Sequence, residues 1–334
     1  MADRYHRIDE PSTGTGHLMA VTIVDRLAGG ASRFFRTHPT TDVPTGTMVQ
    51  LGDRGATYVT DSARIASGPD AGGIDAAEAA KPPIILLHAV VTTGLLSWYS
   101  VIDDLRADFR VITMDQRWHG RGIRSPRFTL DDCADDVVAL ADALGIDRFV
   151  AAGFSMGGGT AQLTWRRHRD RVSGLVLAST GPYFGSSTTG RPRIDAITRF
   201  AAQRFATPVP GLGPHALDER GLSDGAWALR QVRSTRLSHM GEIGYALGQF
   251  DSRPWLGEID VPTAVCVTTR DRVIPIARQQ LLVDGIPGAQ RFDVAAGHAC
   301  CVLQSDIFTP VFVEACGWVC TQTPESTSRD TARP

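Results

Sequence analysis

The sequence predicts an α/β protein with a mostly parallel sheet, helices on both faces of that sheet, and a helical insertion. The main evidence is the alternation of short apolar runs with amphipathic segments, which is the pattern of βαβ units with right-handed crossovers. A break in this alternation between residues 181 and 258 indicates the insertion. The 334 residues, 43% of them hydrophobic and 21% charged, suffice for one large globular domain with such an insertion.

Residues 1–45 are interpreted as an N-terminal extension outside the main domain. Apolar side chains recur at helical spacing over residues 17–35, with arginines beside them. We expect this helix to pack on its own domain, and a membrane surface is the alternative that a basic amphipathic helix leaves open. At the other end, residues 321–334 are polar and are expected to form a disordered tail.

Residues 46–180 form the first part of the predicted core. The continuous apolar run at residues 84–88 is typical of a strand buried on both faces of a parallel sheet. Thr129 is a predicted helix N-cap, and Gly145 is the stop signal of the same helix. The sequence assigns strands to 48–51, 56–59, 84–88, 110–114, 149–152 and 174–179, helices to 95–105, 129–144 and 155–168, and a loop to 62–83.

Residues 181–258 are the predicted helical cap, because apolar and aromatic side chains recur there at helical spacing without a clear strand. The strand–helix pattern then resumes in the second part of the core, residues 259–320. Strands are predicted at 263–268 and 291–294, and helices at 275–283 and 301–317.

Composition excludes several classes of protein. Lys81 is the only lysine, and its Gly/Ala/Pro-rich surroundings fit neither a Schiff base nor a phosphate-binding loop. The net charge of −2 does not favour binding to nucleic acid, and no apolar run approaches the ~20 residues of a membrane-spanning helix.

The six cysteines lack a C-x-x-C pair, which predicts free thiols and a cytoplasmic location. A metal bound by His298, Cys300 and Cys301 is the alternative to buried thiols, and we expect no metal.

The strongest motif is Gly153-Phe154-Ser155-Met156-Gly157, a G-x-S-x-G sequence between a predicted strand and a predicted helix. A sharp turn at this junction exposes the serine hydroxyl at the positive end of the helix. Gly153 and Gly157 leave room for the neighbouring backbone, since they carry no Cβ. Ser155 is therefore the predicted nucleophile.

A serine hydroxyl needs an adjacent base to attack a carbonyl. Asp271 directly follows the strand at 263–268, and His298 directly follows the strand at 291–294. The carboxyl ends of parallel strands lie at one edge of a sheet, so these side chains are expected to meet Ser155 there. His298 is the predicted base, and Asp271 is the predicted acid that orients it. The weaker competitors are Asp284, Asp293, His119 and His239.

An oxyanion requires two backbone N–H donors. We expect the first from Met156 and the second from Val90, with Ala89 as the alternative.

The chain resembles the α/β-hydrolase superfamily from about residue 47 to residue 320. The resemblance rests on five segments: LLHAVVTTG (86–94), DQRWHGRG (115–122), GFSMGGG (153–159), TTRDRVIP (268–275) and AGHACC (296–301). Capped bacterial esterases and lipases are the most similar group. The resemblance implies an eight-stranded sheet, a helical cap after the sixth strand, and no cofactor.

Two residues depart from the pattern of that family. Ala89 stands where glycine usually follows the histidine, and Trp118 stands where the D-x-R-G-x-G motif has its first glycine. Ala89 would misdirect the second oxyanion donor if a glycine-like backbone angle were required there. Trp118 would either narrow the acyl pocket or replace lost packing. The predicted pocket residues are His88, Ala89, Trp118 and Phe154.

These residues predict a serine hydrolase that cleaves a small, hydrophobic carboxylic ester through an acyl-enzyme intermediate. The alternatives on the same fold are a thioesterase or acyltransferase and a C–C bond hydrolase. The latter is disfavoured because its relatives place asparagine near the site and this chain has none. A non-catalytic ligand-binding protein is the alternative from another class.

Overall fold

A computed structural model of the chain describes residues 44–64, 72–185, 227, 230–231, 234–235 and 239–323. Outside the described residues lie 1–43 of the predicted extension 1–45 with its expected helix at 17–35, most of the cap between 186 and 238, and 324–334 of the predicted tail 321–334.

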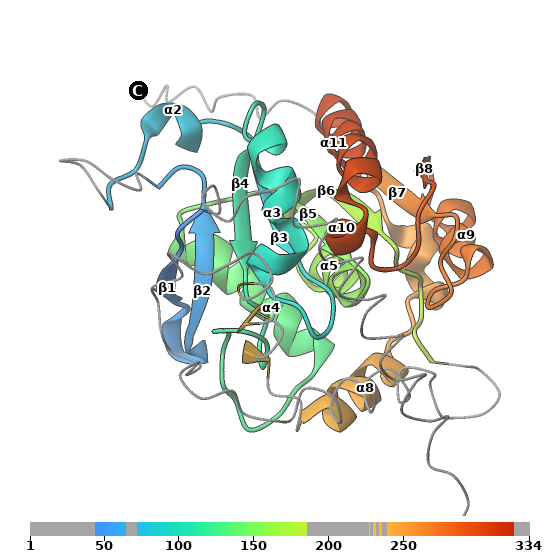
Figure 1. Ribbon diagram of the computed structural model, residues 1–334, viewed down its shortest axis with the longest axis horizontal. Helices are drawn as coiled ribbons and strands as arrows, with labels where there is room; N and C mark the ends of the chain where they lie inside the picture. Colours follow the sequence, from blue (N-terminus) through green and yellow to red (C-terminus); the bar gives the residue numbers. More distant parts are fainter. Residues whose placement is uncertain are drawn as a thin grey trace, which may run out of the picture.

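The core is one eight-stranded sheet with the order β1-β2-β4-β3-β5-β6-β7-β8 (Figure 1). β2 is antiparallel to both of its neighbours, and every pairing from β4 to β8 is parallel. The predicted mostly parallel sheet is therefore confirmed. The strands are β1 (Thr47–Gln50), β2 (Ala56–Asp61), β3 (Pro83–Leu87), β4 (Arg110–Met114), β5 (Phe149–Phe154), β6 (Val172–Ala178), β7 (Thr263–Thr268) and β8 (Gln290–Val294).

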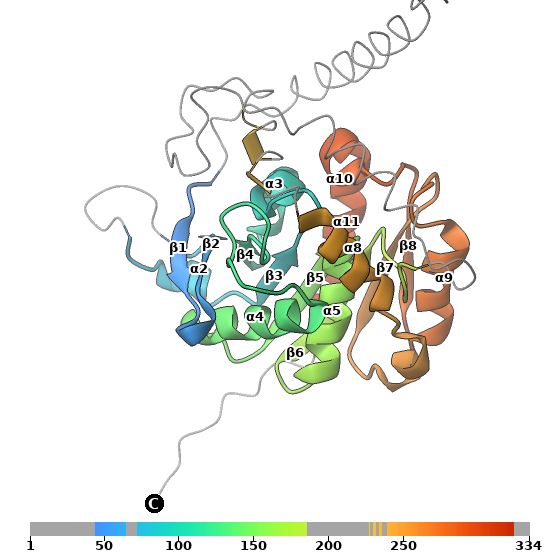
Figure 2. The same cartoon turned by 90° about the horizontal axis from the view of Figure 1, so that it is seen from below.

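Helices cover both faces of the sheet (Figure 2). Alternate residues of each buried strand point to opposite faces, so both faces are apolar and each packs against a layer of helices. On one face, Trp98 packs with Phe308 and Phe312 against Ile84 and Leu86. This face carries α3 (Gly94–Leu105) and α11 (Ser305–Gln322). The opposite face carries α4 (Leu130–Ala143), α5 (Met156–Arg167) and α9 (Ile276–Gly285).

The remaining helices are short. α2 (Ala76–Ala79) lies within the predicted loop 62–83, and the Asp75 side chain caps it. The single closing helix expected at 301–317 is two helices, α10 (Cys300–Leu303) and α11, because Gln304 leaves the helical conformation with ψ 46°. The 3-10 turns are η2 (Gly52–Arg54) and η4 (Arg253–Glu258).

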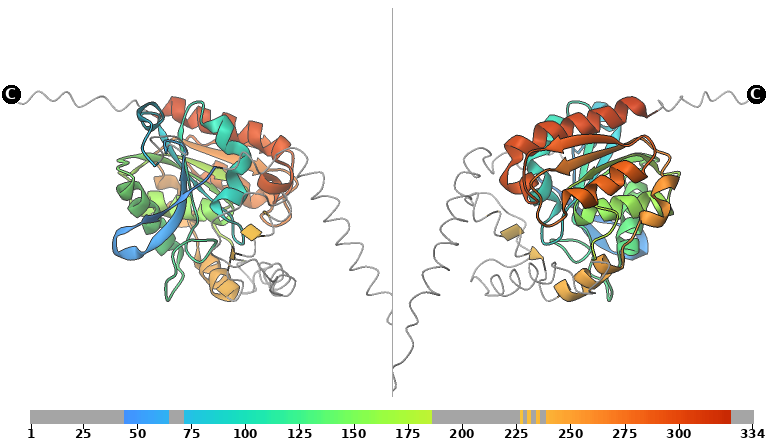
Figure 3. Two further views of the ribbon diagram at one scale, coloured as in Figure 1. Left: turned by 60° about the vertical axis from the view of Figure 1, so that its left-hand side comes forward. Right: turned by 90° about the vertical axis from the view of Figure 1, so that its right-hand side faces the viewer.

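The described part of the predicted cap contains α8 (Met240–Gln249), which lies apart from the two helical layers (Figures 1 and 3). Its buried residues belong to one apolar cluster with Phe184, Phe250 and Met156, the first residue of α5. No helix in the described parts of the chain is long and apolar enough to span a membrane.

Candidate active site

Ser155 lies at the sharp junction of β5 and α5, as the G-x-S-x-G motif predicts. Its backbone has φ 53° and ψ −114°, in the left-handed half of the map that side chains rarely occupy. A Cβ on Gly153 would lie 2.1 Å from the Gly157 carbonyl oxygen, and a Cβ on Gly157 would lie 2.0 Å from the Leu87 oxygen. Both glycines are therefore required by the close approach of backbone around the serine.

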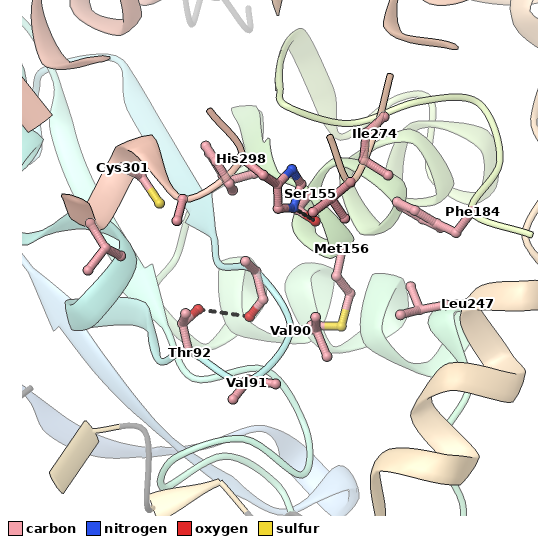
Figure 4. A pocket seen from close by; sticks show the side chains of 15 residues that line it. Val90, Val91, Thr92, Ser155, Met156, Phe184, Leu247, Ile274, His298 and Cys301 are labelled. Atoms are coloured by element: carbon pink, nitrogen blue, oxygen red, sulfur yellow. Dashed lines mark hydrogen bonds between the residues drawn. The ribbon is translucent and has the colours of Figure 1, made fainter. Parts of the chain in front are cut away.

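His298 and Asp271 meet Ser155 at the carboxyl edge of the sheet. The Nε2 atom of His298 lies 3.0 Å from Ser155 Oγ, and its Nδ1 atom lies 2.7 Å from an oxygen of Asp271. Figure 4 shows the imidazole directed at the serine hydroxyl. The three side chains form one hydrogen-bonded chain, although 143 residues separate the serine from the histidine.

Several donors hold the carboxylate of Asp271. The backbone N–H groups of Val273 and Ile274 donate to Oδ1 at 2.8 and 2.9 Å, and the Thr268 hydroxyl donates to Oδ2 at 2.8 Å. Burial by itself would raise the pKa of this carboxyl, but the interaction with His298 and the hydrogen bonds from Ile274 and Thr268 together lower the pKa below its usual value. Asp271 is therefore ionised at neutral pH and its orientation is fixed.

A cavity of about 320 Å³ opens beside Ser155. Its described lining is apolar apart from Thr92, Ser155 and His298, and none of the lining side chains is an acid, a lysine or an arginine. Figure 4 shows Cys301 and Thr92 on one side of the serine and Phe184, Ile274 and Leu247 on the other. The described residues contain no cluster of three histidine, cysteine or acidic side chains that could hold a metal ion.

The sequence profile described as "alpha/beta hydrolase fold" matches residues 82–303, which is more than half of the chain. The chain belongs to the α/β-hydrolase family. It is 29% identical over 229 residues to pimeloyl-[acyl-carrier protein] methyl ester esterase of Chromobacterium violaceum, a match covering 65% of this chain and 87% of the relative. The identity to 3-oxoadipate enol-lactonase 2 of Acinetobacter baylyi is 26% over 243 residues, a match that covers 69% of this chain and 86% of the relative. A solved hydrolase from Pseudomonas aeruginosa shares the fold, with a TM-score of 0.64 and 24% identity. The match covers 81% of this chain and 98% of that hydrolase.

The residues expected to supply the oxyanion donors of this α/β-hydrolase line the same cavity as Ser155. Met156 is the first residue of α5, and Val90 lies in the loop after β3; both line the cavity. Among the described residues, neither backbone N–H has a hydrogen-bond acceptor in the protein. Ala89 has a negative φ and is not strained, so the departure from glycine requires no unusual backbone there.

The predicted pocket residues divide into two pairs. Ala89 and Phe154 line the cavity, whereas His88 and Trp118 do not. Trp118 adopts the left-handed φ of 66° at the position where the family has glycine, and its ring packs on Phe128 and His239. Trp118 therefore contributes packing and does not narrow the cavity.

The competing side chains lie elsewhere. Asp284 is near the end of α9, Asp293 on β8 pairs with Arg291, and His119 is buried against the ring of His88. The sequence interpretation missed Gln279, whose amide contacts Thr268 and Asp271. No motif marks it, although its place in the first turn of α9, eight residues after Asp271, is a usable signal.

His88 is fully buried behind the cavity wall. Its Nε2 atom accepts a hydrogen bond from the Gln116 backbone N–H at 2.9 Å, and Nδ1 donates to the Ala89 carbonyl at 2.7 Å. Burial lowers the pKa of His88 to about 4, with a smaller opposing contribution from the Ala89 carbonyl. Burial likewise lowers the pKa of His119 to about 3.

We expect Gly157→Ala to destabilise the fold by about 3 kcal/mol, because the new methyl group would overlap the Leu87 carbonyl. Thermal unfolding followed by circular dichroism measures the change. The matched control is Gly241→Ala in α8, where no atom lies within 4 Å of the added Cβ and helix propensity improves. Equal melting temperatures of the two variants would contradict the packing argument.

We expect the free energy of unfolding to fall by about 3 kcal/mol for His88 alone as the pH drops from 6.5 to 4. The unfolded chain takes up this proton near pH 6.5, whereas the folded protein excludes it until about pH 4, so protonation favours unfolding in that window. Urea titrations across the window measure the slope. His119→Phe removes the separate contribution of the other buried histidine, whose pKa is lowered further, to about 3. A wild-type stability independent of pH in this window would contradict the expectation.

Proposed function

We propose that the protein is a serine hydrolase that cleaves carboxylic esters through an acyl-enzyme intermediate. The observation that carries the proposal is the hydrogen-bonded chain from Ser155 through His298 to Asp271, placed at the wall of an apolar cavity. Two relatives support an ester as the substrate, because one is named a methyl ester esterase and the other an enol-lactonase.

In the proposed mechanism, His298 Nε2 takes the proton of the Ser155 hydroxyl as its oxygen attacks the ester carbonyl. The ionised Asp271 holds the proton on Nδ1 and stabilises the imidazolium that forms. The backbone N–H groups of Met156 and Val90 receive the oxyanion. The imidazolium then protonates the leaving alcohol, and a water molecule activated by the same imidazole releases the acid.

The cavity supports an uncharged substrate with an apolar acyl group. Its described lining presents no basic side chain that could pair with a substrate carboxylate. A volume of about 320 Å³ accommodates a small molecule. We propose the cytoplasm as the location, since all six cysteines are free thiols.

A tagged fluorophosphonate tests the nucleophile. We expect it to label wild-type protein at Ser155, with no labelling and no ester hydrolysis in Ser155→Ala. Asp271→Asn should reduce kcat about 10⁴-fold, because an asparagine would stabilise the wrong tautomer of His298. Peptide mass spectrometry locates the label, and steady-state assays with p-nitrophenyl esters give kcat.

The matched controls are Ser100→Ala on α3 and Asp293→Asn on β8, which lie outside the cavity lining. Both should label and turn over like the wild type. Full esterase activity in folded Ser155→Ala would refute the proposal. Tight binding of esters without turnover would favour the non-catalytic alternative, and faster turnover of thioesters or added alcohols would favour the thioesterase or acyltransferase.

Leu247→Ala tests which side of the cavity holds the acyl chain. Leu247 lines the cavity from α8, so its truncation enlarges the space and should shift the preferred p-nitrophenyl ester to a longer acyl chain. The ratio of kcat/KM values across the chain-length series measures the shift. We expect this ratio to change about tenfold in favour of the ester that is longer by one or two methylenes. Leu256→Ala in η4 truncates another buried leucine, which lies outside the cavity lining, and should leave the ratio unchanged.

A further inference from the structure

A buried hydrogen-bond network lies beside the Ser155–His298–Asp271 chain and has Gln116 at its centre. Gln116 follows β4 and is 1% exposed. Its backbone N–H donates to His88 Nε2 at 2.9 Å, and its side-chain amide donates to the His88 carbonyl at 2.7 Å. Its amide oxygen accepts from the Thr160 hydroxyl at 2.8 Å. One side chain therefore connects the loop after β3 to α5.

The bond from Gln116 determines which nitrogen of His88 carries the proton. A backbone N–H can only donate, so Nε2 must be the unprotonated acceptor and Nδ1 must carry the proton. That Nδ1–H points at the Ala89 carbonyl, 2.7 Å away. The Thr92 hydroxyl donates to the same carbonyl oxygen at 2.8 Å (Figure 4). Two side chains thus hold the Ala89 oxygen in one direction.

The direction of the Ala89 carbonyl sets that of the Val90 N–H, because both belong to one planar trans peptide and point in opposite directions. We propose that Gln116 is the positioning residue of the oxyanion site: through His88 and the Ala89 carbonyl it aims the Val90 N–H. This inference rests on the proposed function, in which Val90 and Met156 supply the two oxyanion donors.

Thr160 orients Gln116 for this role. Its hydroxyl donates to the amide oxygen, which places the amide nitrogen of Gln116 toward the His88 carbonyl. A flipped amide would bring two carbonyl oxygens together and leave both without a donor. Thr160 lies one helical turn after Met156, and its hydroxyl also contacts the Met156 carbonyl at 3.4 Å. The network therefore fixes the loop carrying Val90 relative to the helix turn carrying Met156.

Gln116→Met tests the proposal, because methionine keeps the volume and removes both side-chain hydrogen bonds. We expect kcat for a p-nitrophenyl ester to fall about tenfold, with KM within about twofold of the wild type, since only the transition state carries the oxyanion. An alkyl trifluoromethyl ketone, which forms a tetrahedral oxyanion adduct with the serine, should bind about tenfold more weakly. The corresponding alkyl methyl carbinol, which has no oxyanion, should bind equally to both proteins.

Gln162→Met is the matched control for losing a buried amide. Gln162 lies on the same helix and bonds to the Gly158 and Gly181 carbonyls and to Ser252, none of which belongs to the loop after β3. We expect this variant to lose stability while kcat and ketone affinity remain at wild-type values. Equal losses of kcat in both glutamine variants would overturn the proposal.

Thr160→Val and Thr160→Ser keep the test informative if Gln116→Met does not fold. Thr160→Ser retains the hydroxyl and should preserve ketone affinity, whereas Thr160→Val should weaken it. Unchanged ketone affinity in Thr160→Val, with an active wild type, overturns the role of this network alone. A folded wild type that neither hydrolyses esters nor binds the ketone instead refutes the proposed function.

Discussion

The left-handed backbone of Ser155 is the constraint on which the rest of the site depends. A positive φ with ψ −114° costs about 1–3 kcal/mol for a residue with a side chain and persists only where its surroundings determine it. The Ser155 N–H donates to the Ala178 carbonyl at 2.9 Å, and the Thr180 hydroxyl donates to the Ser155 carbonyl at 2.8 Å. Hydrogen bonds from the neighbouring strand end thus hold the residue on both sides. The hydroxyl is presented at a fixed point, and the strand ends after β7 and β8 bring their side chains to it.

Two histidines near this point differ in what their surroundings allow them to do. His298 is partly exposed, and its Nδ1 faces the ionised carboxylate of Asp271, which stabilises a positive imidazolium. His88 is fully buried, and its hydrogen-bond partners are a backbone N–H and a backbone carbonyl. Burial without a counter-charge keeps its ring neutral down to about pH 4. One histidine is therefore suited to transferring protons, and the other to holding a loop in place.

The sequence was sufficient for features that follow from local pattern and strand order. The run at Thr263–Thr268 is buried at every position and was assigned with its observed ends. Asp271 and His298 were predicted because each directly follows a strand, and parallel strands end at one edge. The Gln116 network could not be predicted, since its partners are 28 and 44 residues away and a single glutamine in a loop forms no pattern. The break at Gln304 was missed because apolar runs at 300–303 and 307–308 lie on either side of a polar stretch of only three residues.

The departure at Trp118 is accounted for by packing. The left-handed conformation costs about 1–2 kcal/mol there, whereas burying a large apolar side chain contributes about 1.5–3 kcal/mol. The ring is 3% exposed, its Nε1 donates to the Ser125 carbonyl at 3.0 Å, and it packs 4.4 Å from the ring of His239. His239 immediately precedes α8, and Leu247 of that helix lines the cavity. A glycine at this position would relieve the backbone and remove a support of the cap. The tryptophan therefore bears on the shape of the cavity through the cap, and the hydrogen bonds at Ser155 do not depend on it.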